Sequence, residues 1–109
     1  GIDAYEGKSV FYAVRQRDAF AGKTIVIAGG GDSALDWTLN LEPIARRITL
    51  LHRRNEFRAA PESVERMRAL AEAGRIDLKI AEIKGLEGAG GAITGVVTSD
   101  GVIPCDRML

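Results

Sequence analysis

The residues best suited to chemistry in this sequence begin with a glycine-rich turn at residues 29–34. It fits the pattern G-x-G-x-x-A through Gly29, Gly31 and Ala34. In such a pattern the first glycine permits a tight turn, the second admits a pyrophosphate close to the backbone, and the alanine lets a helix pack on a sheet. The free N–H groups of a helix that starts here would face the phosphates. The turn therefore predicts a dinucleotide site.

A basic cluster follows further along the chain. It comprises His52, Arg53 and Arg54, with Arg58 close behind, and no acidic residue occurs in it before Glu56. An NAD site usually has Asp or Glu here to bind the ribose 2′-hydroxyl, whereas guanidinium groups bind phosphate oxygens in pairs. The cluster favours NADP(H), with a solvated basic loop as the alternative. His52 has two interpretations: it contacts the adenosine end, or it simply ends a strand.

Regular elements must position these two motifs. We predict a continuously apolar strand at residues 24–28, an amphipathic helix at 33–42 and a second strand at 48–51, which is a right-handed crossover. The alternative for the glycines is a plain strand-to-helix turn. We expect Asp32 to be the helix N-cap rather than a phosphate ligand. Arg46 and Arg47 are expected to be solvated.

The second half of the sequence completes the expected fold. Pro61 suits the first turn of a helix that reaches about residue 73, with Gly74 as its C-terminal cap. A third strand is predicted at 76–80, and short alternating strands at 83–87, 92–98 and 102–105, with an Asp100-Gly101 hairpin. The predicted fold class is α/β: a Rossmann-like parallel sheet with flanking helices and a three-stranded antiparallel meander as the second crossover.

The composition excludes several classes of function. Fifteen basic and fifteen acidic residues balance, and the 11 arginines are spread along the chain, which argues against a nucleic-acid or membrane-surface role. No apolar run approaches the ~20 residues of a membrane span. Cys105 is the single cysteine, so no internal disulfide can form, and with one histidine we expect no metal site. A reducing, cytoplasmic location fits this usage.

The motifs together resemble a known family. Residues 29–37, His52-Arg53-Arg54 and Phe57-Arg58-Ala59 resemble the NADPH-binding domain of the thioredoxin-reductase-like flavoproteins. Within that group the chain is most similar to the ferredoxin/flavodoxin–NADP+ reductases of the thioredoxin reductase type. The resemblance implies two sets of cofactor-binding residues. The glycine turn, for the pyrophosphate, consists of Gly29, Gly30, Gly31, Asp32, Ser33 and Ala34. The basic cluster, for the 2′-phosphate, consists of His52, Arg53, Arg54 and Arg58.

The resemblance also implies an activity. Hydride would pass between NADPH and an FAD held by a domain that this sequence lacks, and electrons would go to ferredoxin or flavodoxin. No catalytic residue is expected in this chain, which would bind NADP(H) without turnover. A homodimer is compatible with the resemblance.

One departure from the wider family concerns its redox chemistry. Thioredoxin reductases carry a Cys-x-x-Cys before the nucleotide strand, and its cysteines align here with Phe11 and Val14. This removes a dithiol from the stretch. Two alternatives stay open: disulfide reduction with cysteines elsewhere in a longer chain, and a non-catalytic NADPH-binding or sensing domain.

The two ends of the sequence suggest a piece of a longer protein. Residues 1–8 are predicted to be a linker from a missing FAD domain, and residues 9–109 the NADP(H)-binding domain. Residues 9–20 fit a short helix, with a strand at 10–14 as the alternative. Residues 106–109 begin another apolar strand, which by resemblance returns beside the first. We expect this strand to be truncated and the first strand to be left partly unpaired.

Overall fold

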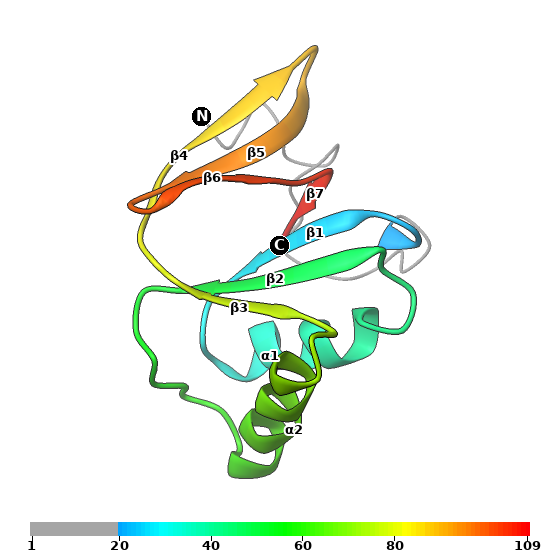
Figure 1. Cartoon of the computed structure of the whole chain (residues 1–109), viewed down its shortest axis with the longest axis vertical. Helices are drawn as coiled ribbons and strands as arrows, with labels where there is room; N and C mark the ends of the chain where they lie inside the picture. The colour runs from blue at the N-terminus through cyan, green and yellow to red at the C-terminus, as the bar shows by residue number, and fades with distance from the viewer. Residues whose placement is uncertain (1–19) are drawn as a thin grey trace.

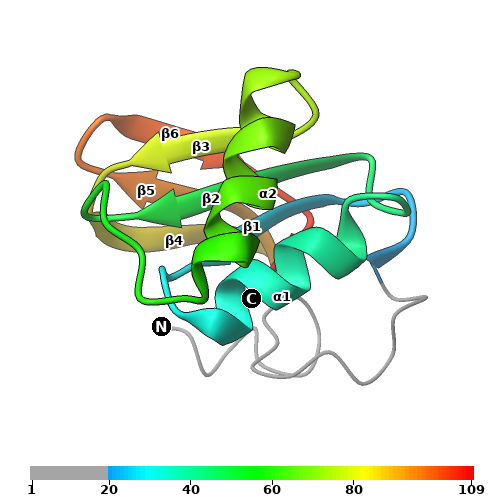
Figure 2. The same ribbon diagram turned by 90° about the horizontal axis from the view of Figure 1, so that it is seen from below.

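The computed structural model describes residues 20–109, and the predictions for residues 1–19, including Phe11 and Val14, lie outside them. In chain order the elements are β1 (Thr24–Ala28), α1 (Asp32–Leu41), β2 (Arg47–His52), α2 (Pro61–Glu72), β3 (Asp77–Ile80), β4 (Ile83–Ala89), β5 (Ala92–Thr98), β6 (Gly101–Pro104) and β7 (Arg107–Met108). They form three layers, in which a four-stranded sheet lies between the two helices and a three-stranded sheet (Figure 1). The view from below shows α1 and α2 across one face of the four-stranded sheet (Figure 2).

The larger sheet is parallel and has the strand order β3-β2-β1-β7. Ile25 is paired with Ile48 and Ala28 with Leu51, so β1 and β2 end together. The carboxyl ends of the parallel strands therefore meet at one edge of the sheet, as expected for a doubly wound sheet. The predicted fold class is confirmed, with the strands and helices within one or two residues of the expected bounds.

Each face of the parallel sheet has its own core. Ile25 and Ile27 face the helices, where they join a cluster with Leu35, Leu50 and Met67. Alternate positions of the same strands face the other way, and Val26 and Leu51 pack with residues of the antiparallel sheet such as Val96. Because side chains alternate across a strand, a central strand covered on both faces must be apolar throughout. This accounts for the unbroken apolar run of β1.

The antiparallel sheet is the predicted meander, in the order β4-β5-β6. Thr98 is paired with Gly101, so Ser99 and Asp100 form the hairpin loop and Gly101 is the first residue of β6. The hairpin is confirmed, although its loop lies one residue earlier than the Asp-Gly pair. Gly101 has φ +123°, a backbone conformation that other residues rarely adopt.

The prediction of a partly unpaired first strand is wrong. β7 lies parallel to β1, and Ile25 is paired with Arg107. The amide of Leu109 donates to the carbonyl of Val26, and the amide of Ala28 donates to the carbonyl of Leu109. The two residues of β7 and the residues next to them therefore provide the backbone hydrogen-bond partners of β1 along this edge.

The prediction that Arg47 is solvated is correct only in part, because its side chain is 39% exposed but is also paired within the fold. Arg47 is the first residue of β2, and its guanidinium donates to both carboxylate oxygens of Asp77 on β3, at 2.8 and 2.5 Å. It also donates to the carbonyl of Gly74 after α2. The hydrogen bond from Arg47 lowers the pKa of Asp77. Strand pairing brings the two side chains together, which local sequence does not reveal. Arg46 is exposed, as predicted.

Neither α1 nor α2, the helices of the described part of the chain, is long and apolar enough to cross a membrane. Within residues 20–109, no cluster of three histidine, cysteine or acidic side chains is arranged to hold a metal ion.

Candidate nucleotide-binding site

The glycine turn leaves β1 in a conformation that requires glycine. Gly29 has φ +133°, and its amide donates to the carbonyl of Leu51 at 2.9 Å. A Cβ at this position would be 3.4 Å from the Cβ of Ala34, which is buried in the first turn of α1. The two roles expected from the sequence, a tight turn at residue 29 and close packing at residue 34, are therefore present in the geometry.

The start of α1 differs from the predicted cap. Gly31 is the N-cap residue, and no side chain caps the helix. Asp32 is the first helical residue, and its Oδ1 accepts a hydrogen bond from the amide of Ala60 at 3.0 Å. The prediction of Asp32 as N-cap is wrong because its carboxylate is engaged with the loop before α2. The first N–H groups of α1, which have no partner inside the helix, therefore remain free of a capping side chain.

Space for a ligand exists above Gly31. A Cβ built on this residue would meet only the carbonyl oxygen of Arg58, at 3.9 Å. Its backbone is extended, with φ −92° and ψ −177°. No neighbouring atom and no special dihedral angle therefore demands glycine at residue 31, which fits a residue kept small for a ligand that approaches the backbone.

The basic loop is joined to the glycine turn through the backbone. The amide of Arg58 donates to the carbonyl of Gly30 at 2.7 Å, and Gly31 and Arg58 form an isolated parallel bridge. The bond from Ala60 to Asp32 adds a third connection. The two motifs that the sequence separates thus form one structural unit.

A cavity of about 370 Å³ lies within this unit. Its lining residues are Gly30, Gly31, His52, Arg53, Arg54, Glu56, Phe57 and Arg58. Arg53, Arg54 and Arg58 are exposed, and none of them forms an ion pair with a carboxylate of residues 20–109. Glu56 is the single acidic residue of the lining. The cavity therefore carries an excess of positive charge suited to an anion.

The remaining predicted site residues lie at the edge of this arrangement. Ser33 is exposed in the first turn of α1, and Asp32 is exposed beside it. Ala34 is buried beneath Gly29 and supports the turn rather than facing a ligand. The structure thus brings the glycine turn and the basic cluster together, and assigns Ala34 to packing.

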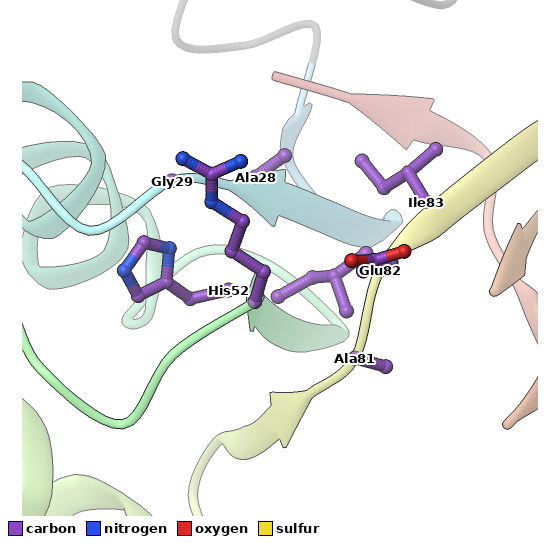
Figure 3. Close-up of a pocket in the computed structure, with 8 residues that line it drawn as sticks. Ala28, Gly29, His52, Ala81, Glu82 and Ile83 are labelled. Atoms are coloured by element: carbon purple, nitrogen blue, oxygen red, sulfur yellow. The ribbon is translucent and has the colours of Figure 1, made fainter. Parts of the chain in front are cut away.

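A second cavity, of about 590 Å³, opens at the carboxyl ends of the parallel strands (Figure 3). Its lining residues are Ala28, Gly29, Leu51, His52, Arg53, Ala81, Glu82 and Ile83. His52 and Arg53 line both cavities, so the two spaces adjoin. Ligands of open α/β sheets bind outside the carboxyl ends of the strands, which is where both cavities lie.

Residues 81–83 were not predicted from the sequence to belong to the site. They connect β3 to β4, and Glu82 and Ile83 lie across the cavity from His52 in Figure 3. A hydrogen bond from Lys84 lowers the pKa of Glu82, and the charge of Arg53 contributes in the same direction. Their position after the third predicted parallel strand was the available signal, since that strand must end at the same edge as the first two.

His52, which had two interpretations, makes contacts within the protein. Its Nε2 lies 3.0 Å from the carbonyl oxygen of Glu56, and because a carbonyl only accepts, this bond places a proton on Nε2. Its ring lies against that of Phe57, with 5.3 Å between centroids and an interplanar angle of 38°. The imidazole also covers Gly30. His52 therefore ends β2 and holds the basic loop on the glycine turn.

Comparison with known proteins identifies reductases that this chain resembles. The chain is 61% identical to a "Ferredoxin--NADP reductase" of Nitrobacter winogradskyi and 57% identical to one of a Bradyrhizobium species, in each case over all of this chain and 33% of the relative. The chain thus spans about a third of the length of these curated relatives. Among solved structures, a thioredoxin reductase of Lactococcus lactis superposes with a TM-score of 0.87 at 25% identity, covering 100% of this chain and 38% of that one.

A family model also matches most of the chain. It describes the pyridine nucleotide-disulphide oxidoreductases, and the match runs over residues 24–101, from the start of β1 to the start of β6. The matched segment contains the glycine turn, the basic loop and every lining residue of the two cavities. The chain belongs to the pyridine nucleotide-disulphide oxidoreductase family.

Proposed function

We propose that this chain is the NADP(H)-binding unit of a flavoprotein reductase that delivers electrons to ferredoxin or flavodoxin. The observation that carries the proposal is the union of the glycine turn with the basic loop through the Gly31–Arg58 bridge and the bond from Arg58 to Gly30. The lining of one cavity thus combines two glycines with three arginines that form no ion pair within residues 20–109. Such a cavity suits a nucleotide with phosphate at two positions.

The pyrophosphate is assigned to the glycine turn. Gly31 leaves room for it, and the uncapped N–H groups of α1 point toward it. The helix dipole adds a favourable interaction of about 0.3–1 kcal/mol with an anion at this end. The Oδ1 atom of Asp32 accepts a hydrogen bond from the amide of Ala60, which holds this carboxylate on the loop before α2.

The 2′-phosphate is assigned to Arg53, Arg54 and Arg58. No carboxylate stands at the end of β2, where an NAD site carries its ribose ligand, because His52 occupies that position. Hydrogen bonds between charged groups contribute about 1.5–3 kcal/mol each. Two or three such arginines are enough to set a strong preference for NADPH over NADH.

The reaction itself is assigned to the longer protein. The family resemblance and the "Ferredoxin--NADP reductase" relatives, of which this chain spans a third, support an FAD in the remaining part. When bound there, FAD would accept hydride from NADPH and release single electrons. The residues described here bind the nucleotide by its phosphates, away from the nicotinamide, and contribute placement rather than acid–base chemistry.

Two other functions are alternatives to this proposal. A disulfide reductase needs a pair of cysteines, whereas this chain has one, Cys105, which is buried. A non-catalytic NADPH-binding or sensing domain would use the same cavity. A flavin absorption spectrum of the longer protein separates the proposed reductase from a sensor, because a flavin-containing reductase is yellow and a simple sensor is colourless.

The test is calorimetric titration of the chain with NADPH and, separately, with NADH. We expect NADPH to bind at least tenfold more tightly, since one charge-assisted hydrogen bond already corresponds to roughly that factor. Raising the salt concentration should lower the affinity for NADPH more than the affinity for NADH. Equal affinity for the two nucleotides would refute the assignment of the arginines.

A further inference from the structure

We infer that Phe57 and Arg68 are positioning residues for the recognition of the 2′-phosphate. They form a stack with His52 that holds the loop of residues 53–58 in its binding conformation. The inference rests on the proposed function and extends it to a side chain of α2 that lines neither nucleotide cavity. We call the set His52, Phe57 and Arg68 the loop stack.

The loop stack joins three separate elements. His52 ends β2, Phe57 belongs to the loop, and Arg68 lies in the middle of α2. The rings of His52 and Phe57 are 5.3 Å apart between centroids, and the guanidinium carbon of Arg68 is 5.3 Å from the centroid of Phe57. Both distances lie in the range in which aromatic pairs and cation–π pairs attract. Phe57 therefore contacts both an imidazole and a guanidinium.

Both outer members of the stack also bind the loop by hydrogen bonds. His52 contacts the carbonyl of Glu56 at 3.0 Å, and Arg68 donates to the side-chain oxygen of Asn55 at 3.2 Å. In the sequence, Asn55 and Glu56 lie between the adjacent arginines 53 and 54 and Arg58. The stack thus fixes the middle of the loop, and the bond from Arg58 to Gly30 fixes its end.

This arrangement has a physical purpose in an anion site. Like charges at Arg53, Arg54 and Arg58 repel one another when no phosphate is present, and no carboxylate of the described residues pairs with them. A loop free to move would separate them, and binding would then have to pay the ordering entropy. Contacts that hold the backbone before the ligand arrives reduce this cost. The benefit appears only for a ligand that reaches the arginines, which is NADPH rather than NADH.

The test compares NADPH with NADH binding in Phe57→Leu, which keeps an apolar side chain and changes no charge. We expect the affinity for NADPH to fall roughly five- to tenfold, from the usual strength of aromatic and cation–π pairs, with less than a twofold change for NADH. Phe57→Tyr keeps the ring face and is expected to retain the preference. Adenosine 2′,5′-bisphosphate and 5′-AMP, used as probes without the nicotinamide, should show the same contrast.

Arg68→Gln tests the other end of the stack against a matched control. Arg66 lies on the same helix, is exposed, and makes no contact with the loop stack among those found in residues 20–109, so Arg66→Gln removes the same charge from α2. We expect Arg68→Gln to lower the affinity for NADPH roughly three- to tenfold. For Arg66→Gln, the logarithm of the fold loss in affinity should be less than half as large. Thermal unfolding of every variant shows whether the fold is intact.

The outcomes separate this inference from the proposed function. If the unchanged protein prefers NADPH but Phe57→Leu and Arg68→Gln retain the full preference, the inference is wrong and the proposed function stands. Equal losses for NADPH and NADH would also overturn it, because they would show a structural role without selectivity. If the unchanged protein shows no preference at all, the proposed function fails first.

Discussion

A Cβ at Gly30 would lie 2.5 Å from Nε2 of His52, because the imidazole fills the space above this glycine. Gly30 is the unspecified position of the fingerprint, and only the family resemblance includes it among the pyrophosphate-binding residues. In the structure it is the surface on which the last side chain of β2 rests. The glycine turn and the basic loop are therefore joined by side-chain packing as well as by backbone hydrogen bonds.

Gly30→Ala should displace the His52 ring and weaken NADPH binding. The new methyl group cannot share the space, so the ring must lose its contact with Phe57 and its bond to Glu56. Each of these is worth about 0.5–1.5 kcal/mol. Titration with NADPH measures the loss, and circular dichroism shows that the fold survives.

A double-mutant cycle identifies the cause of that loss. In a His52→Ala background the extra methyl group at residue 30 meets no ring, so Gly30→Ala should then have little further effect. If the two losses add fully instead, the methyl group acts on the ligand directly and not through His52.

The combined replacement of Arg53 and Arg54 by Ala should lower the affinity for NADPH much more than the affinity for NADH. Each charge-assisted hydrogen bond to the 2′-phosphate corresponds to about 1.5–3 kcal/mol, or roughly ten- to hundredfold in affinity. Arg46→Ala is the control, because Arg46 is exposed at the opposite, amino-terminal edge of the sheet. An equal loss for both nucleotides would show that these arginines do not read the 2′-phosphate.

Gly31→Val should abolish nucleotide binding and leave the fold intact. The backbone of Gly31 is in a region open to valine, and its Cβ would contact only the carbonyl of Arg58. The branched side chain would then occupy the space assigned to the pyrophosphate. Gly85→Val is the control, since its Cβ would meet no atom within 4 Å and Gly85 lies in the antiparallel sheet. Nucleotide binding by Gly31→Val with native affinity would place the pyrophosphate elsewhere.

Much of the fold could be predicted because its signals are local or periodic. The apolar run of β1, the glycine turn and the Pro61 start of α2 each carry their own physical reason in sequence. The pairing of the glycine turn with the basic cluster followed from the geometry of a crossover, in which successive parallel strands end at one edge. Gly74, with φ +74°, ends α2 as expected.

The contacts that could not be predicted depend on distant partners. Asp32 was predicted to cap the helix, but its carboxylate accepts a hydrogen bond from the amide of Ala60. Arg47 was predicted to be solvated, and its side chain is partly exposed, but strand pairing also places Asp77 beside it. In the sequence Phe57 is only one residue of a motif, and its partner Arg68 lies on a helix whose orientation the sequence does not specify. In each case a local preference is overridden by a tertiary contact.

Cys105 should be unreactive in the folded protein. Its side chain is 5% exposed, and burial, with a smaller contribution from Asp106, raises its pKa to about 11. The reactive species is the thiolate, and a rise of about two pKa units from the usual value near 9 lowers its fraction about a hundredfold at pH 8. Alkylation with iodoacetamide at pH 8 should therefore be at least that much slower in the native protein than in urea. Similar rates in the two states would show an accessible thiol.

The same shift predicts a loss of stability in alkali. Above pH 9 the unfolded chain releases the thiol proton while the folded chain keeps it until about pH 11, so the free energy of unfolding falls across this interval. Urea unfolding at several pH values measures the slope, and Cys105→Ala, which has no thiol to titrate, is the control for the lysines and tyrosines. The fall between pH 9 and 11 should be shallower in Cys105→Ala than in the unchanged protein. Identical slopes would mean that the Cys105 thiol ionises equally readily in both states.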